Sequence, residues 1–140
     1  MAILLDASAI LAAADTADLN HGAARAYLER VDEPLLVGAL TLAEADHLLQ
    51  RELGPGATLA LLESITSGAV RVVAPTDADL VRAAELLAAA AEHRPRLTDA
   101  LLVAAAGRLG VRRVATFDRR PLALLVPRGP RGERPIDLEP

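Results

Sequence analysis

The sequence contains no cysteine, no tryptophan and no lysine, and it has one phenylalanine and one tyrosine among 140 residues. Without cysteine, the protein cannot form disulfides, thiolate zinc sites or a cysteine nucleophile. With so few aromatic rings, stacking on nucleic-acid bases is nearly unavailable, and the core has to be aliphatic. The three histidines, His21, His47 and His93, are scattered and lack the spacing of a zinc site.

Long apolar stretches are also missing. The first one, Ala2–Leu5, runs directly into Asp6; it is too short for a signal peptide and lacks a basic start. No apolar run approaches the roughly 18 residues of a membrane-spanning helix. We therefore expect a soluble, cytoplasmic protein that does not enter a membrane. Its length predicts a single domain over residues 1–140, large enough to hold a core without disulfides or metal.

The charge is unevenly distributed, although the net charge is only −4. Residues 108–134 hold eight arginines against two acids, which leaves that segment at about +6 and the rest of the chain at about −10. All 15 basic residues are arginine. A GC-rich genome would explain this bias, and so would selection for guanidinium groups that bind phosphate. A basic segment beside an acidic one is compatible with an RNA ligand.

The pattern of apolar residues predicts strands that alternate with helices. Strands are expected in four short runs that are apolar without clean alternation: Ala2–Leu5, Leu35–Val37, Val70–Ala74 and Val114–Thr116. Helices are expected at Ser8–Ala14, His21–Val31, Leu42–Leu53, Ala57–Ser67, Asp77–Glu92 and Asp99–Leu109. This alternation predicts a three-layer α/β/α sandwich around a parallel sheet.

The pattern weakens after Asp118. Leu122–Val126 fits either an edge strand or a short helix, and Arg128–Gly132 is expected to be a loop. Ile136–Leu138 is expected to add a final edge strand.

Four acids stand at the ends of these predicted elements. Asp6 and Asp118 follow strands, and Glu44 and Asp99 lie in the first turns of helices. Strand carboxyl ends and helix starts share one face of such a sheet, so all four acids map to the face where ligands bind. Two carboxylates about 5 Å apart repel by roughly 3 kcal/mol at an effective dielectric of 20. A fold that gathers them needs a cation, protons or an arginine in compensation.

Each acid taken alone also has a purely structural explanation. Asp6 suits the N-cap of the helix that follows it, and Thr41 with Glu44 fits a capping box. Asp99 would interact favourably with its helix dipole, and Asp118 fits an ordinary turn. The joint placement of all four on one face favours a functional site.

The residues around these acids resemble those of the PIN-domain ribonucleases, and among them the VapC-type toxins of bacterial toxin–antitoxin pairs. Four motifs carry the resemblance, in the right order and at the right spacing: Ile3–Leu11, Leu42–Asp46, Leu97–Ala104 and Ala115–Arg120. Two positions depart from the usual pattern. Ala7 stands where a hydroxyl residue is common, and Pro121-Leu122 stands where His-Phe is frequent.

The resemblance implies a PIN-like fold with about five parallel strands and a Mg²⁺ or Mn²⁺ site. It also implies endonucleolytic cleavage of single-stranded RNA, a homodimer, and neutralisation by a small VapB-type antitoxin. Carboxylates are suitable ligands for Mg²⁺ and Mn²⁺. Asp6, Asp99 and Asp118 are the expected metal ligands, and Glu44 is expected to be a further ligand or to position the attacking water.

Two further groups of residues are expected to support this chemistry. The hydroxyls of Ser8 and Thr116 are expected to hold the ligands or their water. The guanidinium groups expected to contact RNA phosphate are those of Arg112, Arg113, Arg119 and Arg120.

Three alternative functions remain at this stage. A phosphoacceptor module of the receiver or haloacid-dehalogenase type also places acids at parallel strand ends, but both types normally need a lysine, which this chain lacks. A PIN-fold interaction module without catalysis would not need all four acids. A PIN nuclease of RNA maturation or of DNA flaps would share the site, but the compact length favours the toxin.

Overall fold

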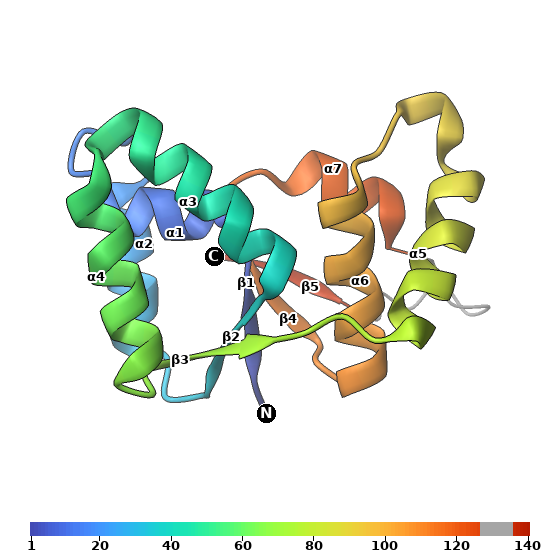
Figure 1. Cartoon of the computed structure of the whole chain (residues 1–140), viewed down its shortest axis with the longest axis horizontal. Coiled ribbons are helices and arrows are strands. Elements are labelled where there is room, and N and C mark those ends of the chain that lie inside the picture. Colours follow the sequence, from blue (N-terminus) through green and yellow to red (C-terminus); the bar gives the residue numbers. More distant parts are fainter. Residues whose placement is uncertain (127–135) are drawn as a thin grey trace.

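The protein was analysed as a computed structural model, in which residues 1–126 and 136–140 are described. Its centre is a five-stranded sheet whose strands all pair in parallel, in the order β3-β2-β1-β4-β5 (Figure 1). The strands are β1 (Ile3–Leu5), β2 (Leu35–Gly38), β3 (Val70–Val73), β4 (Arg113–Ala115) and β5 (Asp137–Glu139). The predicted parallel α/β/α sandwich is confirmed.

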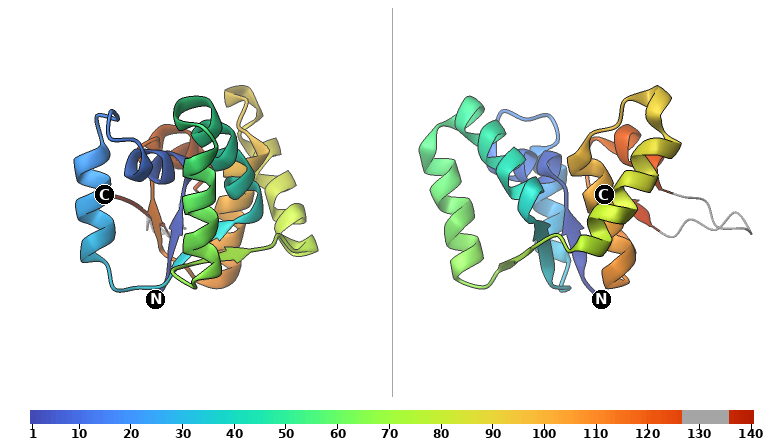
Figure 2. Two further views of the ribbon diagram at one scale, coloured as in Figure 1. Left: turned by 60° about the vertical axis from the view of Figure 1, so that its left-hand side comes forward. Right: turned by 45° about the vertical axis from the view of Figure 1, so that its right-hand side comes forward.

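Helices cover both faces of the sheet, as the further views show (Figure 2). One side holds α1 (Ala7–Ala14), α2 (His21–Arg30), α3 (Ala39–Leu53) and α4 (Pro55–Thr66). The other holds α5 (Asp77–Ala89), α6 (Leu97–Leu109) and α7 (Arg119–Leu125). A short 3₁₀ helix, Ala91–His93, follows α5.

The two hydrophobic cores follow from the alternation of side chains along the strands. In β1, Ile3 and Leu5 pack against the helices of the α1–α4 side, whereas Leu4 packs against those of the α5–α7 side. All three side chains are buried, because a parallel sheet between two helical layers has no solvent-facing side. The central strands therefore read as continuous apolar runs.

The C-terminal part resolves the alternatives left open by the sequence. The segment Leu122–Val126 is mostly helical, because α7 runs to Leu125 and buries Leu122 in the core. The expected edge strand near residue 137 is present as β5 and pairs with β4. The expected loop at Arg128–Gly132 lies outside the described residues. Within residues 1–126 and 136–140, no helix has the length and apolar character needed to cross a membrane.

The strand order reverses direction at β1, because β2 and β3 lie on one side of it and β4 and β5 on the other. At this switch point the backbone N–H of Asp6 donates to the carbonyl of Ala115 at 2.9 Å. The chain therefore leaves β1 and β4 side by side at the carboxyl edge of the sheet. In open α/β sheets this is the place where ligands bind.

Candidate active site

Asp6 begins the site at the end of β1. It occupies the N-cap position of α1, but its side chain makes no capping hydrogen bond to the helix. Instead its Oδ2 accepts hydrogen bonds from the hydroxyls of Ser8 at 2.9 Å and Thr116 at 2.7 Å. The explanation of Asp6 as a side-chain cap is therefore wrong, and the buried carboxylate is held by two hydroxyls from separate elements.

Ser8 and Thr116 also fix the chain that follows β4. The backbone N–H of Phe117 donates to Ser8 Oγ at 3.0 Å, and that of Asp118 donates to Thr116 Oγ1 at 3.0 Å. Both hydroxyls thus join α1 to the end of β4 while they orient Asp6. Both hydroxyls therefore hold an acid of the candidate site.

Glu44 and Asp99 are brought together from α3 and α6 by an arginine. The Nη1 of Arg96 donates to Glu44 Oε1 at 2.6 Å, and its Nε donates to Asp99 Oδ2 at 3.3 Å. The side chains of Asp99 and Glu44 are 3% and 17% exposed, whereas that of Arg96 is 57% exposed. Arg96 therefore covers the two acids from the solvent side.

The electrostatics of Asp99 show that three acids share this region. Burial raises the pKa of Asp99 above its usual value, while the adjacent Arg96 lowers it. The charges of Asp6 and Glu44 raise it further. The net direction is upward, so one guanidinium does not fully offset burial and the two neighbouring carboxylates.

Glu44 is not part of a capping box. The helix α3 begins at Ala39 with Gly38 as its N-cap, so Thr41 lies inside the helix and cannot cap it. The second carboxylate oxygen of Glu44, Oε2, is buried and has no hydrogen-bond partner in the described part of the chain. Buried polar atoms are normally satisfied, so this oxygen has capacity for a ligand.

Asp118 is not joined to the other acids by any side-chain contact in the described part of the chain. Its residue is exposed at the start of α7, and its side chain does not cap that helix. Within residues 1–126 and 136–140, no three acids or histidines stand close enough to hold one metal ion. The charges of Asp6 and Glu44 act on Asp99, and the described contacts do not join Asp118 to these three acids.

The donors of this site are of the type that a divalent metal prefers. The donors are carboxylates, which Mg²⁺ and Mn²⁺ prefer, and Glu44 Oε2 is an acceptor without a partner. However, a positive charge already lies between Glu44 and Asp99, on Arg96. A metal ligated by these acids would have to displace this guanidinium.

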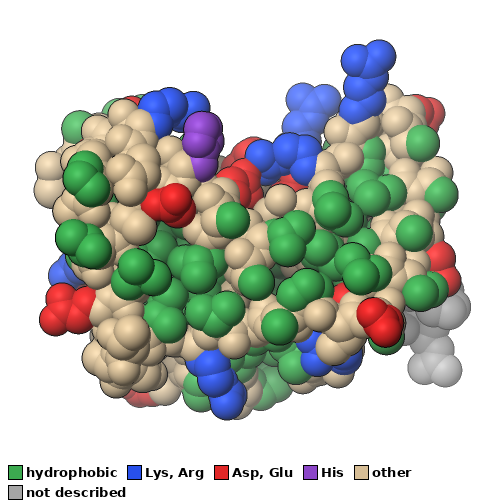
Figure 3. Space-filling model, in the orientation of Figure 1, with side chains coloured by type: hydrophobic (Ala, Val, Ile, Leu, Met, Phe, Trp, Pro, Cys, Tyr) green, Lys and Arg blue, Asp and Glu red, His purple; other side chains and the backbone are tan. Residues whose placement is uncertain are grey.

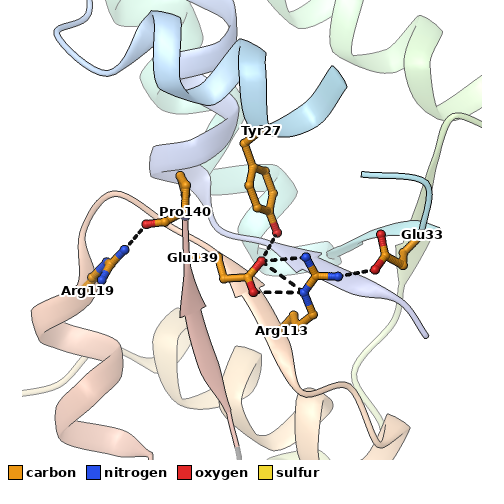
Figure 4. A network of polar contacts seen from close by, with 6 residues as sticks. All are labelled: Tyr27, Glu33, Arg113, Arg119, Glu139 and Pro140. Atoms are coloured by element: carbon orange, nitrogen blue, oxygen red, sulfur yellow. Dashed lines mark hydrogen bonds and ion pairs between the residues drawn. The ribbon is translucent and has the colours of Figure 1, made fainter. Parts of the chain in front are cut away.

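Two of the arginines expected at the RNA are engaged in internal contacts (Figure 4). Arg113 donates to both carboxylate oxygens of Glu139, at 2.9–3.1 Å, and to Glu33. Tyr27 donates to the same glutamate at 2.7 Å. Arg119 donates to the carbonyl of Pro140. These contacts give Arg113 a structural role and do not favour its expected role at phosphate.

The other two arginines flank β4, with Arg112 before its first residue and Arg120 after its last. Arg112 precedes β4 and lines a hollow with Asp79 and Arg108, away from the acids of the carboxyl edge. Arg120 lines a cavity of about 340 Å³ whose wall includes Asp99 and Arg96. Arg120 therefore shares a cavity with an acid of the site.

The segment just before α6 contributes to the site, although it was not among the residues expected there. His93-Arg94-Pro95-Arg96 places two arginines directly ahead of Asp99, outside the basic segment 108–134. The position of Arg96 three residues before a first-turn acid was a signal for the ion pair with Asp99. Its second partner, Glu44, is 52 residues away in the chain, and no local pattern indicates that contact.

Comparison with known proteins agrees with this geometry. The family model described as PIN domain matches residues 3–124. Ribonuclease VapC26 of Mycobacterium tuberculosis is 31% identical over 127 residues, which cover 91% of this chain and 94% of that protein.

Two solved structures have a similar fold. VapC20 of M. tuberculosis, described as a toxin that cleaves the sarcin–ricin loop, has a TM-score of 0.79 and 26% identity, covering 86% of this chain and 93% of its own. The FitAcB structure from Neisseria gonorrhoeae has a TM-score of 0.70 and 18% identity, covering 99% of this chain and 96% of that one.

Proposed function

The chain belongs to the PIN-domain family, and on that premise we propose that it is a metal-dependent, single-strand endoribonuclease, the toxin of a toxin–antitoxin pair. The observation that carries the proposal is the group of Asp6, Glu44 and Asp99 at the switch point of the sheet. Burial and like charges raise the pKa of Asp99 there. Acids whose pKa is perturbed in such a position are typical of catalytic sites.

The residues of the chain would act mainly by position and charge. Asp6, fixed by the Ser8 and Thr116 hydroxyls, and Asp99 would hold a Mg²⁺ or Mn²⁺ ion. Asp118 would complete the set of ligands, and Glu44 would be a ligand or orient the attacking water. When bound, such an ion acidifies a water molecule and offsets charge on phosphate oxygens.

The partners are proposed on the same basis. The similarity to VapC proteins supports an RNA substrate and a small VapB-type antitoxin as the neutralising partner. A homodimer and a cytoplasmic location are also proposed. One PIN-like domain over residues 1–140 is supported by the sheet itself, because β1 and β5 come from the two ends of the chain.

A second candidate function is a PIN-fold interaction module without catalysis. The observation in its favour is that Arg96 already pairs with Glu44 and Asp99, so the acids have an internal cation. A nuclease of RNA maturation is a variant of the main proposal, with the same site and a different substrate.

One experiment separates the two candidates. The purified protein is incubated with single-stranded RNA in EDTA, Mg²⁺ or Mn²⁺, together with Asp6→Asn and Asp99→Asn. We expect cleavage by the wild type only with metal, and at least a hundredfold loss in both variants. Both variants should retain the circular dichroism spectrum of the wild type, since removing one of several clustered carboxylates relieves repulsion. Absence of cleavage by the wild type under all metal conditions would favour the interaction module.

A further inference from the structure

A second feature of the carboxyl edge is a basic cavity beside the acids. It measures about 340 Å³, lies between the segment before α6 and the helix α7, and is lined by His93, Arg94, Arg96, Asp99 and Arg120, among others. Asp99 and Arg96 belong both to this cavity and to the acidic group, so the two are contiguous. Figure 3 shows the same juxtaposition, with acidic side chains at the floor of a notch in the upper edge and basic ones on its rim.

Arg94 is held in this cavity by an unusual backbone. Its φ is 49°, and it is the one non-glycine residue with a positive φ among the described residues. It closes the 3₁₀ helix Ala91–His93 in the left-handed conformation, with its N–H donating to Ala91 at 3.1 Å. A glycine would adopt this conformation at lower cost. Strain of this kind is concentrated at functional sites.

The guanidinium groups of Arg94 and Arg120 have no ion-pair partner in residues 1–126 and 136–140. Arg108 and Arg113, in contrast, each donate two or more hydrogen bonds to a carboxylate. Both Arg94 and Arg120 are exposed. Two unpaired arginines beside a buried acid form an anion site, because guanidinium forks match phosphate oxygens.

We propose that this cavity is a subsite for a backbone phosphate of the RNA strand, held by Arg94 and Arg120 next to the carboxylates. The assignment rests on the proposed function for its choice of RNA as the ligand. A phosphate is favoured because the lining holds several arginines, whose guanidinium groups match phosphate oxygens, and no Phe, Tyr or Trp. In this subsite the RNA strand lies across Asp99. Arg94 binds the phosphate together with Arg120, whereas Arg112 and Arg113 do not take part.

The test measures binding without cleavage. Fluorescence anisotropy with a labelled single-stranded oligoribonucleotide is recorded in EDTA over a range of salt concentrations. The variant is Arg94→Gly with Arg120→Ala; glycine removes the guanidinium and suits the left-handed backbone, so the fold is retained. The control is Arg71→Ala, which removes one charge from the edge strand β3, far along the sheet order.

Loss of a phosphate contact flattens the plot of log affinity against log salt by about 0.7 for a single strand. We expect the double variant to bind more weakly than the wild type, with a slope flatter by about 0.7 to 1.4. Arg71→Ala should keep the wild-type slope. A double variant with the wild-type slope overturns the subsite. If its RNA binding is unchanged while binding of an acidic partner protein falls, the cavity serves that partner and the proposal also fails.

The outcomes also distinguish this subsite from the nuclease function itself. If the wild type binds RNA but does not cleave it in Mn²⁺, while the double variant shows a flatter salt slope, that result would support the subsite and contradict the endonuclease. If the wild type cleaves RNA and the double variant keeps the wild-type salt slope, the endonuclease is supported and the subsite is contradicted. Failure of the wild type to bind single-stranded RNA in EDTA would overturn the subsite whatever the cleavage result.

Discussion

At the scale of single residues, Arg96 controls the charge of the site. It donates to Glu44 and Asp99 from opposite ends of its guanidinium, and it is the one basic side chain measured in contact with these acids in the described part of the chain. The acids of the site are therefore partly compensated from within the protein. A divalent ion would have to compete with this internal cation.

The first prediction concerns Arg96→Gln. Without the guanidinium, the repulsion among Asp6, Glu44 and Asp99 is unopposed. The free energy of unfolding at neutral pH should therefore fall by about 1 kcal/mol. The expected loss is small because the arginine side chain is half exposed. Mn²⁺ binds the native state and should stabilise the variant more than the wild type. Differential scanning fluorimetry with and without Mn²⁺ measures both effects.

A matched control is Arg82→Gln, which breaks an exposed ion pair with Glu85 on α5. This variant should show the wild-type response to Mn²⁺. An equal rise in melting temperature for Arg96→Gln and the wild type would mean that Arg96 does not compete with a metal.

At the scale of elements, α5 is held by a capping box and by an ion pair whose acid is buried. Thr76 and Asp79 exchange side-chain-to-backbone hydrogen bonds at the start of the helix. Arg108 of α6 donates two hydrogen bonds to Asp79, both at 2.9 Å. These bonds from Arg108 lower the pKa of Asp79 despite its burial, and the Thr76 backbone lowers it further.

The second prediction is the pH dependence of this element. A carboxyl whose pKa is lowered by folding stabilises the protein above its unfolded pKa of about 3.9, and this contribution is lost as pH falls through the folded value. Asp79→Asn should therefore be less stable than the wild type at pH 7, and the difference should narrow at pH 3. Urea unfolding at the two pH values measures this.

Thr76→Ala provides the comparison for Asp79→Asn. It should cost about 1 kcal/mol through loss of the cap, and it leaves the bonds from Arg108 to Asp79 in place. If Asp79→Asn differs from the wild type equally at both pH values, the ion pair with Arg108 does not contribute to acid sensitivity.

A second element, β5, is connected to the site through the end of β4. The backbone N–H of Thr116, whose hydroxyl holds Asp6, donates to the carbonyl of Glu139 at 2.5 Å. The side chain of Glu139 is in turn fixed by Arg113 and Tyr27.

The third prediction is that Glu139→Gln loosens this edge of the sheet. The charge-assisted bonds from Arg113 are weakened, so hydrogen exchange at the amide of Thr116 should become faster. Asp137→Asn is a suitable control, because Asp137 is exposed and its side chain has no measured partner in the described residues. Unchanged exchange at Thr116 in Glu139→Gln would show that β5 is held by its backbone pairing alone.

At the scale of the whole molecule, α4 is the least buried of the helices around the sheet. None of its residues is fully buried, and Leu59 and Leu62 are 66% and 42% exposed. Of the described large hydrophobic residues that are exposed, two lie on α4 and none on α2. An exposed apolar face of this kind marks an interaction site.

The fourth prediction is a homodimer in which α4 takes part. Burying a leucine stabilises an interface by about 1.5–3 kcal/mol, so Leu59→Glu with Leu62→Glu should shift the protein towards monomers. Light scattering at micromolar concentration measures the mass. Particles of only 14.6 kDa for the wild type would contradict the dimer. A Leu→Glu variant that unfolds, as shown by circular dichroism, would be replaced by Leu59→Ala.

The sequence by itself determined the parallel α/β/α architecture and the edge of the sheet at which the acids lie. Apolar runs and amphipathic segments are local patterns, and a parallel sheet brings strand ends and helix starts to one edge whatever the details of packing. The position of Asp6 beside the end of β4 follows from that rule. The two hydroxyls of Ser8 and Thr116 were also predicted to support an acid, since each lies within two residues of one.

Only the tertiary structure decided which charges meet. Arg96 reaches Glu44 across 52 residues, and Arg113 reaches Glu33 across 80, so no pattern within one element could reveal either pair. Tertiary contacts also give Arg113 an internal role, and none of them joins Asp118 to the other acids. The packing of the segment before α6 places its arginines along the cavity that contains Asp99. Side-chain pairing depends on the packing of whole helices against the sheet, whereas the placement of strand ends depends only on topology.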